Sequence, residues 1–144
     1  MAANTNAVFL LTPKTGFTIT STSAVTSFDG TDANVKLLFT ASATFGSKIE
    51  DVYWQYTGST GANSPNIRFW INNGSTVATA ANNSYLMEFN IPNVTVSQMA
   101  VNSPGSVGLM WRANLILPVS YRLYVATTAA ITNGIAVTAV GGDY

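Results

Sequence analysis

Short apolar segments recur about every 8 to 15 residues with turn-forming residues between them, and this spacing most restricts how the chain can fold. Several segments alternate apolar and polar side chains with a period of two, for example residues 17–20, 49–57 and 121–126. Such alternation is typical of strands with one buried face. No window of eleven or more residues keeps the 3.6-residue period of a helix. The sequence therefore predicts an all-β fold with about nine or ten strands.

The residue types agree with this fold class. Thr, Val and Ile together account for 40 of the 144 residues, and β-branched side chains favour pleated strands over helices. Strands that each bury one face pair well as an antiparallel sandwich, and 144 residues suit one domain. We expect a single antiparallel β-sandwich over residues 1–144, of the jelly-roll type, with a short polar N-terminal arm at about residues 1–6.

Several predicted connections carry turn chemistry. Residues 27–32 contain Gly30, which can adopt a positive φ. The run 57–65 has no large apolar side chain and is expected to be an exposed loop. The pair Asn73-Gly74 is the type favoured in two-residue type I′ turns, and Asn133-Gly134 is expected to turn the chain into a last strand.

Charge is scarce along the whole chain. Only 12 residues are charged, six of each sign, and the formal net charge is zero. Ser, Thr and Asn, 46 residues in all, supply most of the polarity. Six scattered basic residues cannot form the positive stripe that a phosphate backbone requires, so no nucleic-acid partner is expected. Few charges also leave few means of keeping copies apart, and part of the surface is expected to be covered by neighbouring proteins.

The missing residue types exclude whole classes of chemistry. The chain contains no cysteine and no histidine, which removes disulfides, thiolate nucleophiles and the usual proton shuttle near neutral pH. We therefore expect no enzymatic activity, no cofactor and no metal. There is no apolar run of 18 residues and no basic start of a secretion signal, so no membrane partner is expected.

Carboxylates offer the remaining route to catalysis or calcium binding, and their placement favours neither. Asp29 and Asp32 flank Gly30 in a predicted turn, where Asp side chains bind their own backbone. Glu50 and Asp51 are adjacent in a predicted strand and are expected to point to opposite faces. A glycosidase needs two carboxyl groups across one cleft, which makes a hydrolase a distant third hypothesis.

Each of the three arginines lies beside large aromatic residues. Arginine and aromatic residues together are typical of binding hot spots and allow stacking. Three interpretations stay open: an aromatic residue in the core beside an outward arginine, a protein–protein interface, and a platform for a glycan. The candidate interface residues are Arg68, Trp70, Trp111, Arg112, Tyr121, Arg122 and Tyr144.

Four blocks occur in order over about residues 35–144. They are Arg68-Phe69-Trp70-Ile71-Asn72-Asn73-Gly74, Glu88-Phe89-Asn90-Ile91-Pro92, Leu117-Pro118-Val119-Ser120-Tyr121-Arg122-Leu123 and Gly141-Gly142-Asp143-Tyr144. This ordered pattern resembles small virion structural proteins of tailed bacteriophages, of the capsid decoration or cement type. The chain departs from the family pattern at Ser120, where the family has a glycine before the aromatic residue.

The resemblance implies a non-enzymatic β-sandwich that forms a homotrimer and binds between subunits of the major capsid protein, with the virion as its location. An alternative from a different class is a tail-associated or receptor-binding β-domain that recognises a surface glycan. This alternative would use the aromatic residues and the loop at residues 57–65. The copy number per particle separates the two hypotheses.

Overall fold

The computed structural model of the chain describes residues 10–57, 65–91 and 109–144. These residues form eight strands and one short 3-10 helix, η1. In chain order the elements are β1 (Thr12–Ile19), β2 (Lys36–Thr40), β3 (Ser47–Tyr56), β4 (Asn66–Asn72), η1 (Ala80–Asn82), β5 (Asn83–Asn90), β6 (Leu109–Leu117), β7 (Arg122–Thr127) and β8 (Ile135–Asp143). The all-β class that the sequence predicts is confirmed.

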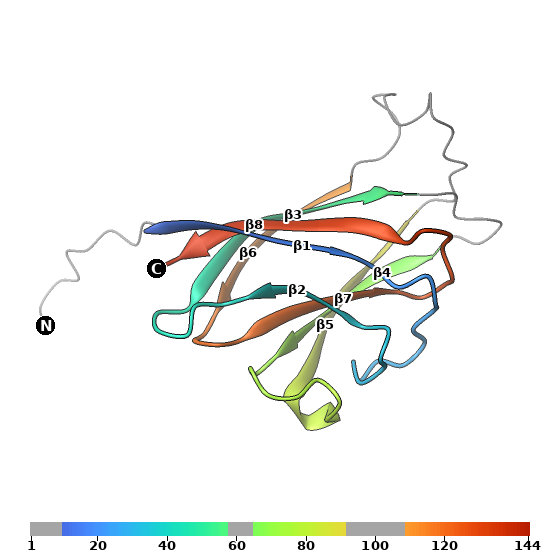
Figure 1. Cartoon of the computed structure of the whole chain (residues 1–144), viewed down its shortest axis with the longest axis horizontal. Helices are drawn as coiled ribbons and strands as arrows, with labels where there is room; N and C mark the ends of the chain where they lie inside the picture. Colours follow the sequence, from blue (N-terminus) through green and yellow to red (C-terminus); the bar gives the residue numbers. More distant parts are fainter. Residues whose placement is uncertain (1–9, 58–64, 92–108) are drawn as a thin grey trace, which may run out of the picture.

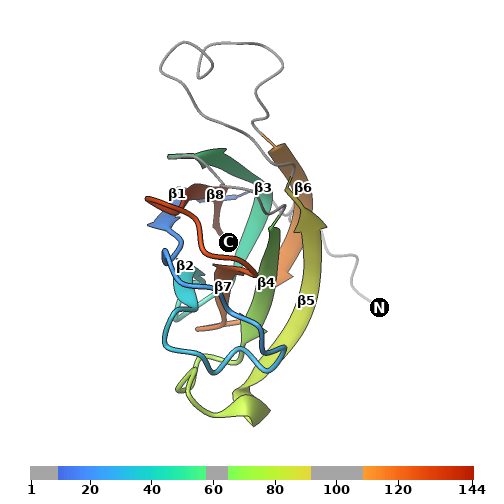
Figure 2. The ribbon, with the colours of Figure 1, turned by 90° about the vertical axis from the view of Figure 1, so that its right-hand side faces the viewer.

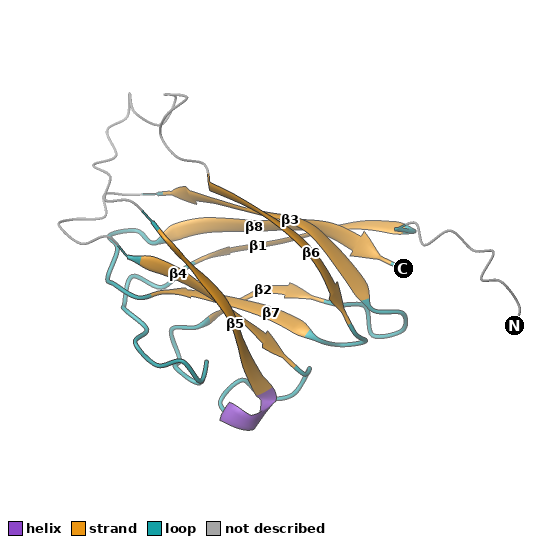
Figure 3. Ribbon diagram, turned by 180° about the vertical axis from the view of Figure 1, so that it is seen from behind, coloured by secondary structure: helices purple, strands orange, loops and turns teal. Residues whose placement is uncertain are grey.

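The strands form two antiparallel sheets of four strands that pack as a β-sandwich (Figures 1 and 3). Sheet I has the strand order β1-β8-β3-β6, and sheet II has the order β2-β7-β4-β5. Most neighbouring strands are therefore distant in sequence. The end view shows β1 and β2 along one side of the sandwich, with β5 and β6 along the other (Figure 2).

The main core lies between the sheets, where alternate residues of each strand point inward. Its aromatic centre is formed by Trp54 of β3, Phe69 of β4 and Phe89 of β5, with ring centroids 5.3–6.2 Å apart. Tyr56 also points inward, and its burial raises the pKa of its phenol to about 12. The buried members are Leu38, Phe39, Ala41, Ile49, Val52, Trp54, Tyr56, Ile67, Phe69, Ile91, Leu117, Leu123, Val125, Ile131, Ile135, Val137 and Ala139.

Sheet II is covered on its outer face as well. The segment between β1 and β2 crosses this face and places Val25 and Val35 against Trp70 and Tyr124 in a second apolar cluster. Consequently β4 and β7 are buried almost continuously, whereas β3 and β8 of sheet I largely alternate between buried and more accessible residues. The two sheets therefore differ in their outer faces.

Glycine lets the strands approach closely where the sandwich closes. A Cβ atom at Gly16 of β1 would overlap the carbonyl oxygen of Leu38 in β2, so only glycine fits this position without a shift. At the other end of β1, Lys14 lies over the Phe39 ring and pairs with Asp143 at 3.4 Å. Asp143 also accepts a hydrogen bond from the buried Ser47 hydroxyl. These contacts fix the end of β8 between β1 and β3.

Two expectations about strand positions are wrong, and the structure answers one question that the sequence leaves open, namely whether Asn73-Gly74 makes a tight turn. The sequence predicts that Thr12-Pro13-Lys14 ends the short apolar run at residues 7–11, but a strand, β1, begins at Thr12. Proline is tolerated because β1 is an edge strand with a partner on one side only. The segment 108–117 is apolar enough for a central strand, yet β6 lies at the other edge of sheet I. Asn73 is not among the described residues with positive φ, so no type I′ turn forms and η1 interrupts a longer connection.

Other expectations agree with the structure or fall outside its described part. Gly30 has φ +71°, and Asn133 and Gly134 both have positive φ just before β8. Ser120 takes φ +65° between β6 and β7, so the turn forms with serine where the resembled family has glycine. The arm at residues 1–6, most of the 57–65 loop and the segment 94–99, for which the sequence allows a strand or one turn of helix, lie outside the described residues.

Trp54 offers the most direct test of the core. Its side chain is 3 % exposed, so Trp54→Ala is expected to lower the free energy of unfolding by about 3–5 kcal/mol. Among the described residues, no acceptor lies within hydrogen-bond distance of its Nε1. Trp54→Phe, which removes this unpaired donor, is expected to cost less, about 1–2 kcal/mol. Urea unfolding measures both, and a loss near zero for Trp54→Ala would contradict this placement.

Candidate interaction surfaces

Arg68 and Trp70, two of the candidate interface residues, are internal contacts. Both point to the outer side of sheet II, and the 20–35 segment covers them, leaving Arg68 8 % and Trp70 1 % exposed. Alternation along the strand correctly predicts that Arg68 and Trp70 point to the opposite face from Phe69. It does not reveal that residues 20–35, which we call the covering segment, lie over that face. In this chain they are therefore internal contacts of sheet II and not surface residues, and a part for them in an interface stays a prediction.

Arg68 holds the covering segment in place. Its Nε donates to Glu88 Oε2 at 2.7 Å, and its Nη1 donates to the Thr26 carbonyl oxygen at 3.1 Å. The guanidinium carbon lies 4.0 Å from the centre of the Phe28 ring. One planar cation thus joins β5, β4 and the covering segment, which is a geometry that lysine cannot reproduce. Burial, and then the charge of Glu88, raise the pKa of the neighbouring Tyr85.

The other five candidates do not converge on one place. Trp111 points inward and packs on Phe69, with ring centroids 5.3 Å apart, while Arg112 beside it points outward and is exposed. This pair fits the interpretation of a core aromatic beside an outward arginine. The remaining three candidates are partly buried, and Tyr121 packs on the main core. Arg122 donates from Nη1 to the Ser75 carbonyl oxygen at 3.1 Å. The backbone N–H of Tyr144 donates to the Gly46 carbonyl oxygen at 3.4 Å.

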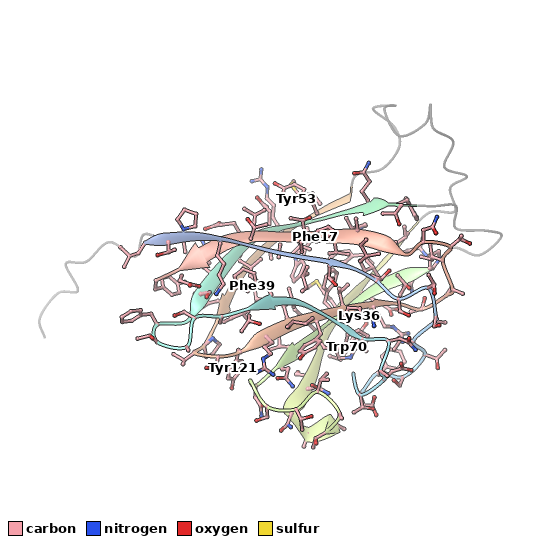
Figure 4. All side chains as sticks on the ribbon, in the orientation of Figure 1. Phe17, Lys36, Phe39, Tyr53, Trp70 and Tyr121 are labelled. Atoms are coloured by element: carbon pink, nitrogen blue, oxygen red, sulfur yellow. The ribbon has the colours of Figure 1, made fainter. Side chains whose placement is uncertain are left out.

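The outer face of sheet I carries an exposed apolar surface, which we call the open face. In the strand register, Phe17, Thr138, Tyr53 and Met110 occupy one row across all four strands. Figure 4 shows Phe17 and Tyr53 on β1 and β3 of this sheet. Phe17 is 62 % exposed and Tyr53 is 43 % exposed. The large apolar residues of the open face are Phe17, Ile19, Tyr53, Met110, Ile116 and Val140.

The charges on the open face are few and balanced. Lys48 Nζ pairs with Glu50 Oε1 at 2.7 Å. Asp51 lies opposite Arg112 in the β3–β6 register and accepts a hydrogen bond from the Tyr53 hydroxyl at 3.4 Å. The expectation that Glu50 and Asp51 point to opposite faces is wrong, because the register of β3 shifts between Ile49 and Asp51 and both side chains lie on the open face. The face thus has two charges of each sign and no net charge. A protein surface without net charge could therefore cover the open face without electrostatic repulsion between the two surfaces.

A second apolar surface, the tip, lies at the end of the sandwich where β1 starts and β8 ends (Figure 1, left). It consists of Leu11, Phe45 and Val119, all exposed. Hydrogen bonds connect the three segments that carry them, partly through the end of β8. The Leu11 N–H donates to the Asp143 carbonyl oxygen at 2.9 Å and the Tyr144 N–H to that of Gly46 at 3.4 Å, while the Ser120 N–H donates to the Ser42 carbonyl oxygen at 3.0 Å. The segments are therefore held together before any partner binds.

The edges of sheet I are less suited to contacts than its face. Pro13 lacks a backbone N–H in the edge strand β1. In the edge strand β6, Asn114 has φ +43° and the pairing with β3 shifts register next to it. Proline and irregular edge strands are common devices against edge-to-edge pairing. A partner of sheet I is therefore better placed on its face than alongside its edge.

A depression of about 290 Å³ is the feature closest to a glycan site. Ile71, Tyr121 and several amide side chains line it, including Asn73, Asn82 and Asn83. The amides are already engaged: Asn83 Nδ2 donates to Val77 at 2.7 Å and Asn82 Nδ2 donates to Thr76 at 2.9 Å, each to a carbonyl oxygen. Their observed role is to hold the connection between β4 and β5.

The turn carboxylates behave as the sequence predicts. Asp29 accepts hydrogen bonds from the backbone N–H and the hydroxyl of Thr31, which lower the pKa of its carboxyl. Asp32 accepts one from the Asn34 N–H at 2.7 Å. Within residues 10–57, 65–91 and 109–144, no three Asp or Glu side chains are grouped as a metal site would require. No helix of this part is long and apolar enough to cross a membrane.

Sequence reasoning missed the open face because it assigned one apolar phase to each strand. β1 carries Phe17 and Ile19 in the phase that faces outward, and β6 carries Met110 and Ile116 in its outward phase. In β6 the usable signal is the presence of large apolar residues in both phases, because Trp111 and Leu115 alternate with Met110 and Ile116. Such a strand needs cover on two sides. β1 offers no such signal, since its only large apolar residues are in the outward phase.

The Arg68 network predicts a stability effect that differs from that of an exposed arginine. Arg68→Ala is expected to lower the free energy of unfolding by about 2–4 kcal/mol, because it leaves the Glu88 carboxylate without its partner and loosens the covering segment. Arg68→Lys should cost less, and the exposed Arg112→Ala should stay within about 0.5 kcal/mol of the unmodified protein. Chemical denaturation separates the three, and equal stability of Arg68→Ala and Arg112→Ala would contradict the network.

Comparisons with known proteins add no relative. No protein-family model matches the chain. No curated protein sequence matches it significantly. The resemblance to bacteriophage decoration proteins therefore stays a prediction from the four sequence blocks.

Proposed function

We propose that this protein is a non-enzymatic virion structural protein of the capsid decoration or cement type. In this proposal it forms a homotrimer and stabilises a phage head by binding between subunits of the major capsid protein. The observation that carries the proposal is the open face, an apolar, net-neutral sheet surface with Phe17, Tyr53 and Met110 across its strands. Exposed apolar patches of this kind typically mark protein interaction sites.

The chemistry of the chain supports a role based on contact area. It has neither histidine nor cysteine, and only 8 % of its residues are charged. Interface cores are enriched in aromatic residues and methionine, and the row of Phe17, Tyr53 and Met110 on the open face has this composition. Many copies on one particle add their individual contacts, so no single tight site is needed.

The strand order supports placing the sandwich in the jelly-roll class. A jelly roll has eight strands in two sheets, arranged as two Greek keys, and is frequent among viral capsid and lectin domains. Four antiparallel strands in each of two sheets, in the orders β1-β8-β3-β6 and β2-β7-β4-β5, support this assignment. The fold class alone does not assign a function, so it adds weight only together with the open face.

A tail-associated or receptor-binding domain remains the second proposal, and the amide-lined depression beside Tyr121 is the observation that favours it. Amides and aromatic rings are suited to sugars, but Asn82 and Asn83 already bind backbone carbonyls. We therefore rank a glycan site below a protein interface.

The number of copies in purified particles tests the proposal. A decoration protein is expected in copy numbers on the order of hundreds, comparable with the major capsid protein, and on the head surface. Quantitative mass spectrometry of particles, with cryo-electron microscopy for location, measures both. A few to some dozens of copies at the tail would favour the receptor-binding alternative. Absence from particles would contradict both proposals.

A further inference from the structure

We propose that the open face of one copy binds the tip of the next copy, so that identical head-to-tail contacts close the homotrimer. This inference rests on the proposed function, because the trimer comes from that proposal. To the proposed homotrimer, the inference adds which two surfaces form each contact and how they pair. The occupant of the open face is thus a second copy of this chain.

The distribution of exposed apolar side chains carries the first step. Twelve large apolar side chains are exposed in the described part of the chain, and nine of them lie on the open face or the tip. The two surfaces are different in shape and composition, since one is a sheet face and the other is three hydrogen-bonded chain segments. A ring with cyclic symmetry uses two unlike surfaces on each subunit, whereas a two-fold dimer uses one surface twice.

Size is the second step. Four strands spaced about 4.8 Å apart, with eight to ten residues each at about 3.3 Å, span roughly 19 Å by 30 Å, or about 600 Å². Stable interfaces bury about 800 Å² on each partner. The open face supplies most of that area, and the residues at its margin, Lys48 and Arg112 among them, can supply a polar rim.

Electrostatics is the third step. The open face has no net charge, and the side chains that define the tip, Leu11, Phe45 and Val119, are uncharged. Contact between two copies therefore brings no like charges together, in a chain whose formal net charge is zero. The tip segments are also joined by backbone hydrogen bonds, which lowers the entropy cost of docking them.

Single variants on each surface test the contact. Tyr53→Asp on the open face and Phe45→Asp on the tip each place a charge in the proposed interface. The matched control is Leu37→Asp. Leu37 of β2 is 44 % exposed, nearly the same fraction as Tyr53, but it lies on neither of the two surfaces. Phe17→Asp repeats the test from β1, and far-ultraviolet circular dichroism with thermal melting verifies that each variant folds. Sedimentation equilibrium measures the mass.

The unmodified protein and Leu37→Asp are expected to be trimers, while the open-face and tip variants fall to one third of that mass. Mixing Tyr53→Asp with Phe45→Asp gives the sharpest result. Each mixed pair retains one intact face and one intact tip, so head-to-tail pairing predicts heterodimers in the mixture and monomers in either sample alone. A folded open-face or tip variant that stays trimeric, or a mixture without heterodimers, would overturn the inference.

The outcome is separable from the proposed function. A monomeric unmodified protein at all tested concentrations overturns the inference, although particles can still carry the protein in high copy number. A trimer that depends on both surfaces but is missing from purified particles supports the inference and contradicts the capsid role.

Discussion

The unequal covering of the two sheets is the constraint on which the rest of the structure depends. Sheet II is covered outside by the 20–35 segment, and the guanidinium of Arg68 secures that segment through Glu88, the Thr26 carbonyl and the Phe28 ring. Sheet I keeps an exposed apolar outer face instead. A chain of 144 residues with 12 charges thus covers the outer face of one sheet and leaves that of the other exposed.

Periodicity predicted the strands well because burial on one face imposes a period of two on the sequence. β3 and β7 lie within one or two residues of the predicted segments 49–57 and 121–126. The sequence was least informative where the chain covers itself. Arg68 looks like a surface residue in its strand, and only the distant 20–35 segment makes it internal. Edge positions were equally hidden, since strand order depends on pairings between segments far apart in sequence.

For the candidate interface residues too, the sequence predicted local orientation but not the contacts made by distant segments. Arginine beside aromatic residues correctly indicated a change of face along a strand, as Trp111 and Arg112 demonstrate. It did not indicate which outward residues stay exposed. Phe17, Tyr53 and Met110 share one row only because β1, β8, β3 and β6 are neighbours, and local sequence contains no record of that order.

The central claim is that the open face is buried against protein in the assembled state. Hydroxyl-radical footprinting at low and high protein concentration tests this claim most directly. Met110 is a sensitive reporter because its thioether oxidises readily, and Leu37 serves as an internal reference outside the face. The account predicts that oxidation of Met110 and Tyr53 falls as copies assemble, while Leu37 is unchanged. Equal oxidation of Met110 in dilute and assembled protein would contradict it.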